Sequence, residues 1–114
     1  NGNNQRLYCG HVATGTSTAL GIQNSGWSHS IPSDTDYHHY VITMNGSTAT
    51  LYNNTFAHSS KNYTSYTLSG QINVGGRSGY RWNGEIPVFK IYSRVLTTTE
   101  ITQNYNAYKK RFNL

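Results

Sequence analysis

Four carboxylate side chains, the only acids in this chain of 114 residues, limit the chemistry that it could carry out. They are Asp34, Asp36, Glu85 and Glu100. Glycoside hydrolysis needs two carboxyl groups that face each other across a sugar ring, about 5 to 10 Å apart. Glu100 is predicted to act at the start of a helix, and Glu85 adjoins the start of a predicted strand. The acids therefore form poor pairs, and we expect that the protein is not an enzyme.

Metal binding has little support in the sequence. Asp34 and Asp36 flank Thr35 in a predicted loop, where they could help to hold calcium, which takes about six to eight oxygen ligands. Solvated acids ahead of a strand are the commoner case, so calcium is a minor alternative to a site without a cofactor. His38 and His39 would point to opposite faces of a strand and could not chelate one metal together.

Aromatic side chains in predicted loops are the candidates for binding sugars. Trp27, Tyr80 and Trp82 occur in Gly- and Ser-rich stretches of a chain that has ten tyrosines and two tryptophans. An aromatic ring can stack on the apolar face of a pyranose while neighbouring amides bind its hydroxyl groups. The candidate glycan-binding residues are Trp27, Asn24, Tyr80, Arg81, Trp82 and Asn83. The alternative is that both tryptophans pack within the fold, with Trp82 over an open end of it.

Composition indicates a protein outside the cytosol. Only 11% of the residues are charged, whereas Asn, Ser, Thr, Gly and Tyr are abundant, which is common in extracellular and virion-surface β-proteins. The net charge is +5, but the basic residues are scattered apart from Lys109 to Arg111, so we expect no nucleic-acid partner. The lone Cys9 excludes an internal disulfide. We also expect no membrane insertion, because no apolar run approaches the roughly 18 residues that span a bilayer.

The elements that must position these residues are mostly short strands. Residues 37–45 alternate with the period of a strand, Asn45-Gly46 is a strong hairpin signal, and residues 47–53 supply the returning strand. Further strands are predicted at 6–11, 19–23, 71–76 and 84–93, and one weak strand within 55–69. Residues 77–83 are expected to form a loop, and Pro87 marks an edge or a bulge because it cannot donate a ladder hydrogen bond. Five to seven short strands separated by turns suggest an antiparallel sandwich.

The chain should finish with one amphipathic helix. Thr97 can cap it, Glu100 can reach back to the cap amide, and Leu96 can pack on Ile101. An apolar stripe follows at helical spacing and comprises Ile101, Tyr105, Tyr108 and Phe112. The side chains expected to face away are Thr102, Gln103, Asn106, Lys109 and Lys110. We expect this helix to dock on the sandwich through its aromatic stripe.

The closing segment carries a family resemblance. The matching elements are "INVGG" at 72–76, "GEI" at 84–86, "IYSRVL" at 91–96, "TTTEI" at 97–101 and "NYNA" at 104–107. Together they resemble the end of the concanavalin A-like lectin/glucanase superfamily in its laminin-G-like form, especially copies in bacteriophage structural proteins. The hairpin at 37–54 is similar to the family's hairpin, with Tyr37 where Trp is usual and Asn54 where Gly is usual. The resemblance covers 37–112 and implies a jelly-roll sandwich.

The resemblance also leaves questions that the residues alone do not answer. The family normally has more strands than residues 1–36 can supply, so we expect either a reduced sandwich or strands donated by a preceding segment or a neighbouring subunit. Residues 1–114 would form a single domain, complete or the C-terminal part of a longer chain. The family's hydrolases carry an "E-x-D-x-x-E"-like strand, which this sequence lacks.

The expected function is that of a non-enzymatic structural module of a virion, either a capsid-decoration or a fibre protein of a bacteriophage, with weak glycan binding. Its partners would be other virion proteins or copies of itself, and host or environmental glycans. The alternative is a dedicated lectin domain of a tail fibre or a bacterial surface protein. A remnant or working glucanase is the third hypothesis.

Overall fold

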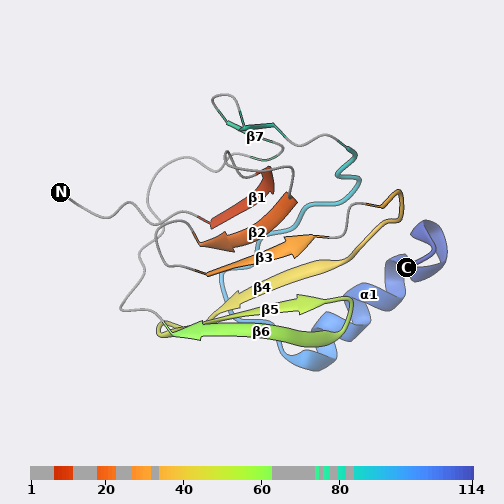
Figure 1. The fold of residues 1–114 in the computed structure, drawn as a ribbon. Coiled ribbons are helices and arrows are strands. Elements are labelled where there is room, and N and C mark those ends of the chain that lie inside the picture. Colours follow the sequence, from red (N-terminus) through yellow and green to blue (C-terminus); the bar gives the residue numbers. More distant parts are fainter. Residues whose placement is uncertain are drawn as a thin grey trace. The chain divides into compact units, whose positions relative to one another are not determined.

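The computed structural model describes residues 7–11, 18–22, 27–31, 34–62, 74, 76–77, 80–81 and 84–114, which form strands and one helix (Figure 1). The chain divides into two compact units. Unit 1 comprises 1–33 with 67–90, and unit 2 comprises 34–66 with 91–114. That residues 1–114 form one domain stays a prediction.

Unit 1 contains a three-stranded antiparallel sheet in the order β1-β2-β3. The strands are β1 (Leu7–His11), β2 (Thr18–Ile22) and β3 (Trp27–Ile31). The first two confirm predicted strands to within a residue at each end. The third was predicted to be loop, which is wrong: "WSHSI" alternates large and small residues with period two, and all five of its residues pair with β2. Its Gly- and Ser-rich flanks hid that short alternation.

Two further predictions, for residues 77–83 and 84–93, need correction. The predicted loop at 77–83 contains a ladder between β7 (Gly76–Arg77) and β8 (Tyr80–Arg81), in which Arg77 pairs with Tyr80. The predicted strand at 84–93 does not form: this segment has no regular structure, and none of the described strands pairs with it. Pro87 explains part of this result, because it cannot donate a ladder hydrogen bond. Most of the predicted strand at 71–76 lies outside the described residues.

Unit 2 contains a second three-stranded antiparallel sheet, in the order β4-β5-β6. Its strands are β4 (Tyr40–Met44), β5 (Thr48–Asn53) and β6 (Phe56–Asn62). The predicted hairpin at Asn45-Gly46 is confirmed: Asn45 Oδ1 accepts a hydrogen bond from the Thr48 amide at 2.9 Å, and Gly46 has φ of 93°. Strand β6 confirms the weak strand that was predicted within 55–69.

The turn between β5 and β6 depends on Asn54, which has φ of 57°. Asn tolerates this left-handed conformation better than most residues, so it can stand where related sequences have Gly. Asn54 is also bound to His39: its amide donates to the His39 carbonyl at 2.7 Å, and its own carbonyl accepts from His39 Nδ1 at 3.3 Å. The turn is therefore joined to the residue that precedes β4.

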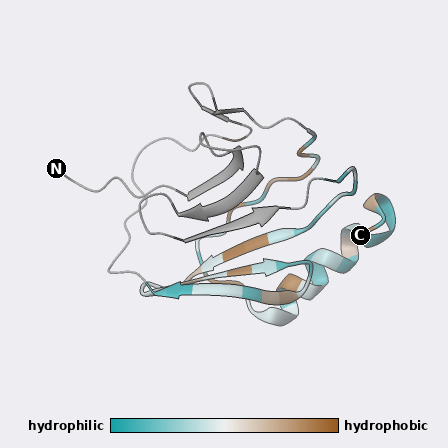
Figure 2. Cartoon of the chain, viewed as in Figure 1, coloured by the Kyte–Doolittle hydropathy of each residue, from teal (hydrophilic) through white to brown (hydrophobic). Residues whose placement is uncertain are grey.

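Strand β6 is irregular next to this turn. Leu51 and Tyr52 are consecutive in β5, but they pair with Ser59 and Ala57, so His58 is an extra residue in β6. This is the pattern of a β-bulge, which bends the strand and increases its twist. Figure 2 shows hydrophobic residues on β4 and β5 and at the start of β6, whereas the far end of β6 is hydrophilic.

Helix α1 (Thr98–Phe112) follows as predicted. Thr97 Oγ1 accepts from the Glu100 amide at 3.3 Å, and Glu100 Oε2 accepts from the Thr97 amide at 2.9 Å, which together form a capping box. Leu96 and Ile101 are both buried, as their predicted packing requires. Asn113 ends the helix in the left-handed conformation, with its amide donating to the Lys109 carbonyl.

The two faces of α1 also follow the prediction. Ile101 is fully buried and the three aromatic residues of the stripe are half-buried, whereas all five residues expected to face away are exposed. The stripe contacts aromatic residues ahead of β4, since the rings of Tyr37 and Phe112 lie 5.1 Å apart and those of His39 and Tyr105 lie 6.0 Å apart. The helix is thus held against the segment that precedes β4 in its own unit.

Candidate functional site

The structure places only half of the predicted glycan-binding residues. Trp27 is the first residue of β3, paired with Ile22, and Tyr80 and Arg81 form β8. Trp27 and Tyr80 thus lie in strands and not in the loops expected for them, because backbone pairing with β2 and β7 extends to them. The predicted residues Asn24, Trp82 and Asn83 lie outside the described residues. The glycan site on these six residues stays a prediction.

The carboxylate of Asp34 is engaged locally. His38 Nε2 lies 2.9 Å from Asp34 Oδ1, which also accepts from the Asp36 amide at 3.1 Å. These interactions, with the hydrogen bond from His38 as the largest cause, lower the pKa of Asp34 below its ordinary value. Among the described residues, no group of three or more His, Cys, Asp or Glu side chains could hold a metal ion. Calcium at Asp34 and Asp36 stays a prediction.

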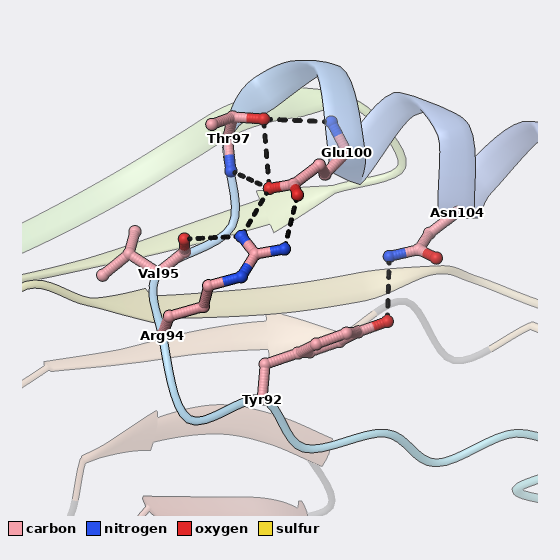
Figure 3. Close-up of polar contacts among 6 residues, drawn as sticks. All are labelled: Tyr92, Arg94, Val95, Thr97, Glu100 and Asn104. Atoms are coloured by element: carbon pink, nitrogen blue, oxygen red, sulfur yellow. Dashed lines mark hydrogen bonds and ion pairs between the residues drawn. The ribbon is translucent and has the colours of Figure 1, made fainter.

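The carboxylate of Glu100 is engaged more fully, as Figure 3 shows. Arg94 donates to it through two nitrogens, Nη1 to Oε2 at 2.9 Å and Nη2 to Oε1 at 2.5 Å. The hydrogen bonds from Arg94, and next the one from the Thr97 amide, lower the pKa of Glu100 to about 2. The same pairing raises the pKa of Arg94. Tyr92 is also joined to the helix, because Asn104 Nδ2 donates to its hydroxyl at 3.2 Å.

These environments do not suit acid catalysis. A general acid that works near neutral pH needs a carboxyl group whose pKa is raised, usually by burial or by a second carboxylate. Asp34 and Glu100 have lowered pKa values, each because a nitrogen of a nearby side chain donates to the carboxylate. The Arg94–Glu100 pair instead fixes the segment before α1 to the first turn of the helix.

Sequence reasoning missed one group of side chains, which we call the cross-strand row: His38, Tyr40, Asn53 and Phe56. Tyr40 pairs with Asn53, and Asn53 pairs with Phe56, so these three share one face of the sheet. The ring of His38 lies 5.9 Å from that of Tyr40. Tyr37 and His39, which contact α1, alternate with His38 and Tyr40 along the chain. Along β5, Asn53 alternates in phase with Ala49 and Leu51, which are fully buried, so Tyr40 and Asn53 lie on a covered face of the sheet.

The chemistry of the cross-strand row is mixed. Phe56 is 78% exposed, more than any other large apolar side chain in the described residues. The side-chain oxygen of Asn53 is buried and accepts no hydrogen bond from the described part of the chain. Buried polar atoms are normally satisfied, so such an oxygen needs an explanation. The register that assembles this row is not visible in the sequence, although the turn residues Asn54-Thr55 just before Phe56 were a usable signal.

No helix in the described part of the chain has both the length and the apolar character needed to cross a membrane. The last turn of α1 carries three basic residues, Lys109, Lys110 and Arg111. Lys109 Nζ lies 5.7 Å from the centroid of the Tyr105 ring. The guanidinium of Arg111 lies 5.1 Å from the centroid of the Phe112 ring. Cations at this end of a helix are favoured by its dipole. Their placement has a structural explanation and does not require a polyanionic partner.

Comparison with known proteins gives one family and one solved structure. The model of a family described as the concanavalin A-like lectin/glucanases superfamily, of the laminin G type, matches residues 1–102. The solved structure is an S-layer domain-containing protein (residues 221–444) from Clostridium thermocellum ATCC 27405, with 22% sequence identity and a TM-score of 0.53. The alignment covers 78% of this chain and 51% of that one, so this chain spans about half of its length. No curated protein matches.

Proposed function

This chain belongs to the concanavalin A-like lectin/glucanases superfamily, and from that premise we propose that it is a non-enzymatic module on the surface of a bacteriophage particle. It decorates the capsid or forms part of a fibre, and it binds glycans weakly. In this proposal the antiparallel sheets belong to a concanavalin A-like jelly roll. Its partners are other virion proteins, copies of itself and sugars on a host or in the environment.

The observation that carries the proposal is the state of the acids. Glycoside hydrolysis needs one carboxyl group that holds a proton and a second that faces it across the sugar. Glu100 is held by Arg94 and by the cap of α1, and Asp34 is held by His38. Asp36 is two residues from Asp34 in the same exposed turn, and Glu85 belongs to unit 1. Binding without hydrolysis fits these side chains better than catalysis does.

A surface location is supported by composition and by the likeness in fold. The chain has 11% charged residues and is rich in Asn, Ser, Thr, Gly and Tyr. The similar solved structure is named as an S-layer domain-containing protein, which is a protein of a cell surface. The phage assignment rests on the resemblance of the closing segment to phage structural proteins.

The likeness to the S-layer protein also favours a second candidate, a lectin domain of a bacterial surface protein. Here sugar recognition is the main task and attachment to a particle plays no part. The two candidates differ in what the chain attaches to. Co-sedimentation of the purified chain with phage particles supports the first, whereas co-sedimentation with bacterial envelopes, lost in the presence of free glycan, supports the second.

A glycan array combined with a hydrolysis assay tests the proposal. We expect weak binding to at least one glycan and no release of reducing sugar from it. Loss of that binding in Trp27→Ala or Trp82→Ala would locate the site on the predicted residues in unit 1. Hydrolysis of a bound glycan that is abolished by Glu85→Gln would overturn the proposal and establish a glucanase. A silent array together with attachment to particles would leave decoration as the sole function.

A further inference from the structure

We propose that Asn45, in the turn between β4 and β5, is a site of spontaneous deamidation. The backbone nitrogen of Gly46 attacks the side-chain amide of Asn45, and the isoaspartate product loosens the hairpin. Water is the co-reactant and ammonia is the leaving group, so the modification requires no enzyme or cofactor. The site is independent of the proposed glycan binding.

The nucleophile is the backbone nitrogen of Gly46. Gly46 is exposed, and its amide donates no hydrogen bond within the part of the chain that the structure describes. Nothing lies within 4 Å of the position that a Cβ atom would occupy there. Solvent can therefore remove the amide proton, and no side chain of residue 46 hinders the nitrogen. Because the two reacting groups belong to adjacent residues, the attack is intramolecular and closes a succinimide ring.

The electrophile is the side-chain amide carbon, Cγ, of Asn45. Its oxygen, Oδ1, accepts from the Thr48 amide at 2.9 Å and from the Ser47 amide at 3.5 Å. Attack on Cγ turns this oxygen into an oxyanion, and donors that already point at it stabilise the developing charge. The same hydrogen bonds hold the Asn45 side chain over the turn. The folded hairpin therefore presents both reacting groups.

The reaction is a net hydrolysis without oxidation or reduction. The Gly46 nitrogen gives its proton to solvent and forms a bond to Cγ of Asn45. The bond between Cγ and the side-chain nitrogen then breaks, and this nitrogen takes up a proton and leaves as ammonia. Water adds to either carbonyl carbon of the succinimide and breaks its bond to the Gly46 nitrogen. Opening at Cγ gives isoaspartate or aspartate according to which of the two bonds breaks: cleavage at Cγ gives aspartate, and cleavage at the main-chain carbonyl gives isoaspartate.

The two products differ in their effect on the hairpin. Aspartate keeps an oxygen that can accept from the Thr48 amide, so the turn stays closed. Isoaspartate carries the main chain through the former side chain, which lengthens the turn by a methylene group. The bond from the Asn45 amide to the Thr48 carbonyl and the pairing of Met44 with Ala49 both depend on the length of this turn. Isoaspartate therefore displaces Ala49, which is fully buried.

The experiment is incubation of the folded chain at mildly alkaline pH, followed by peptide mass spectrometry with fragmentation that distinguishes aspartate from isoaspartate. Asn45 should gain the mass of a deamidation, at a rate less than about tenfold below its rate in the urea-unfolded chain. Asn54 is the internal control. It also lies in a turn between strands, but Thr55 follows it, and a β-branched side chain hinders the attacking nitrogen. Deamidation of Asn45 only in urea, or no faster than that of Asn54, would overturn the site.

Two variants test the consequence for the hairpin. Asn45→Asp reproduces the aspartate product and should melt as the fresh chain does, whereas the isoaspartate fraction of the incubated chain should melt about 5 °C lower or more. Equal thermal midpoints for these two samples would overturn the effect on the hairpin. Asn45→Gln would have to close a larger ring, so incubation should leave both its mass at residue 45 and its thermal midpoint unchanged. Loss of stability in that variant on incubation would overturn Asn45 as the cause.

Discussion

The first turn of helix α1 is fixed by a carboxylate, a guanidinium and a hydroxyl near the solvent, whereas its later turns are held by aromatic rings. At the start, Glu100 joins Arg94 to the cap residue Thr97. Toward the end, Tyr105 contacts His39, and Phe112 contacts Tyr37 and Tyr108. The start, held by an ion pair and a charged cap, should respond to acid and salt, while the Phe112 contacts with Tyr37 and Tyr108 should respond to loss of packing.

The comparison shows how a short terminal helix is attached to a sheet. The polar network sets where the helix begins, because a capping box satisfies amides that the helix itself cannot. Burial of Ile101 and of the half-buried aromatic stripe attaches the helix, since exposed ion pairs contribute little to stability. Position and attachment therefore depend on different residues and can be changed separately.

The largest effect is expected from Ile101→Ala, at the junction of the two regions. Ile101 is fully buried, so removing most of its side chain should lower the free energy of unfolding by about 3 kcal/mol. Urea denaturation followed by circular dichroism measures this change. Gln103→Ala is the matched control, because Gln103 is an exposed residue of the same helix, and it should change the stability by less than about 0.5 kcal/mol.

Phe112→Ala tests the aromatic end by itself. The Phe112 ring contacts Tyr37 and Tyr108 and is half-buried, so its loss should cost about 2 kcal/mol. The loss should be the same at pH 3 and pH 7, because no carboxylate takes part in these contacts. A cost that disappears at pH 3 would show that the two ends are not independent.

Thr97→Ala tests the start of the helix. The variant removes the hydroxyl that accepts from the Glu100 amide, which should cost about 1 kcal/mol, whereas Thr97→Ser should restore most of this loss. Thr99→Ala, an exposed position two residues later, is the control. Equal thermal midpoints for Thr97→Ala and Thr99→Ala would contradict a stabilising role for the cap.

The smallest effect should come from Glu100→Gln, and its sign depends on pH. The pKa of Glu100 falls from an ordinary 4.5 to about 2 in the folded chain. Its charge therefore contributes stability that is fully present above about pH 4.5 and is lost as the pH falls toward 2. Glutamine can keep the capping geometry but carries no charge. The thermal midpoints of the variant and the unchanged chain should differ at pH 6 and converge near pH 2; a constant difference would exclude the charge as the cause.

Local signals explain which parts of the fold could be predicted from sequence. The Asn45-Gly46 hairpin and helix α1 were predicted because their turn and capping residues act on neighbours a few positions away. Strand β3 was missed although its partner β2 ends only a few residues before it, because its Gly- and Ser-rich flanks hid the short alternation. A strand was wrongly predicted at 84–93, where Pro87 cannot donate a ladder hydrogen bond. The cross-strand row needed more: Tyr40, Asn53 and Phe56 align only when two successive hairpins fix the register of β4, β5 and β6, and the sequence predicted only the first of these hairpins.

The extra residue His58 in β6 has a consequence for how one copy of this sheet could pair with another. Strand β6 is outermost in the described three-stranded sheet. A regular edge at high local concentration would template runaway fibril growth from one copy to the next. The irregularity at His58 interrupts the even spacing of backbone donors and acceptors that such growth requires, so crowding need not lead to amyloid.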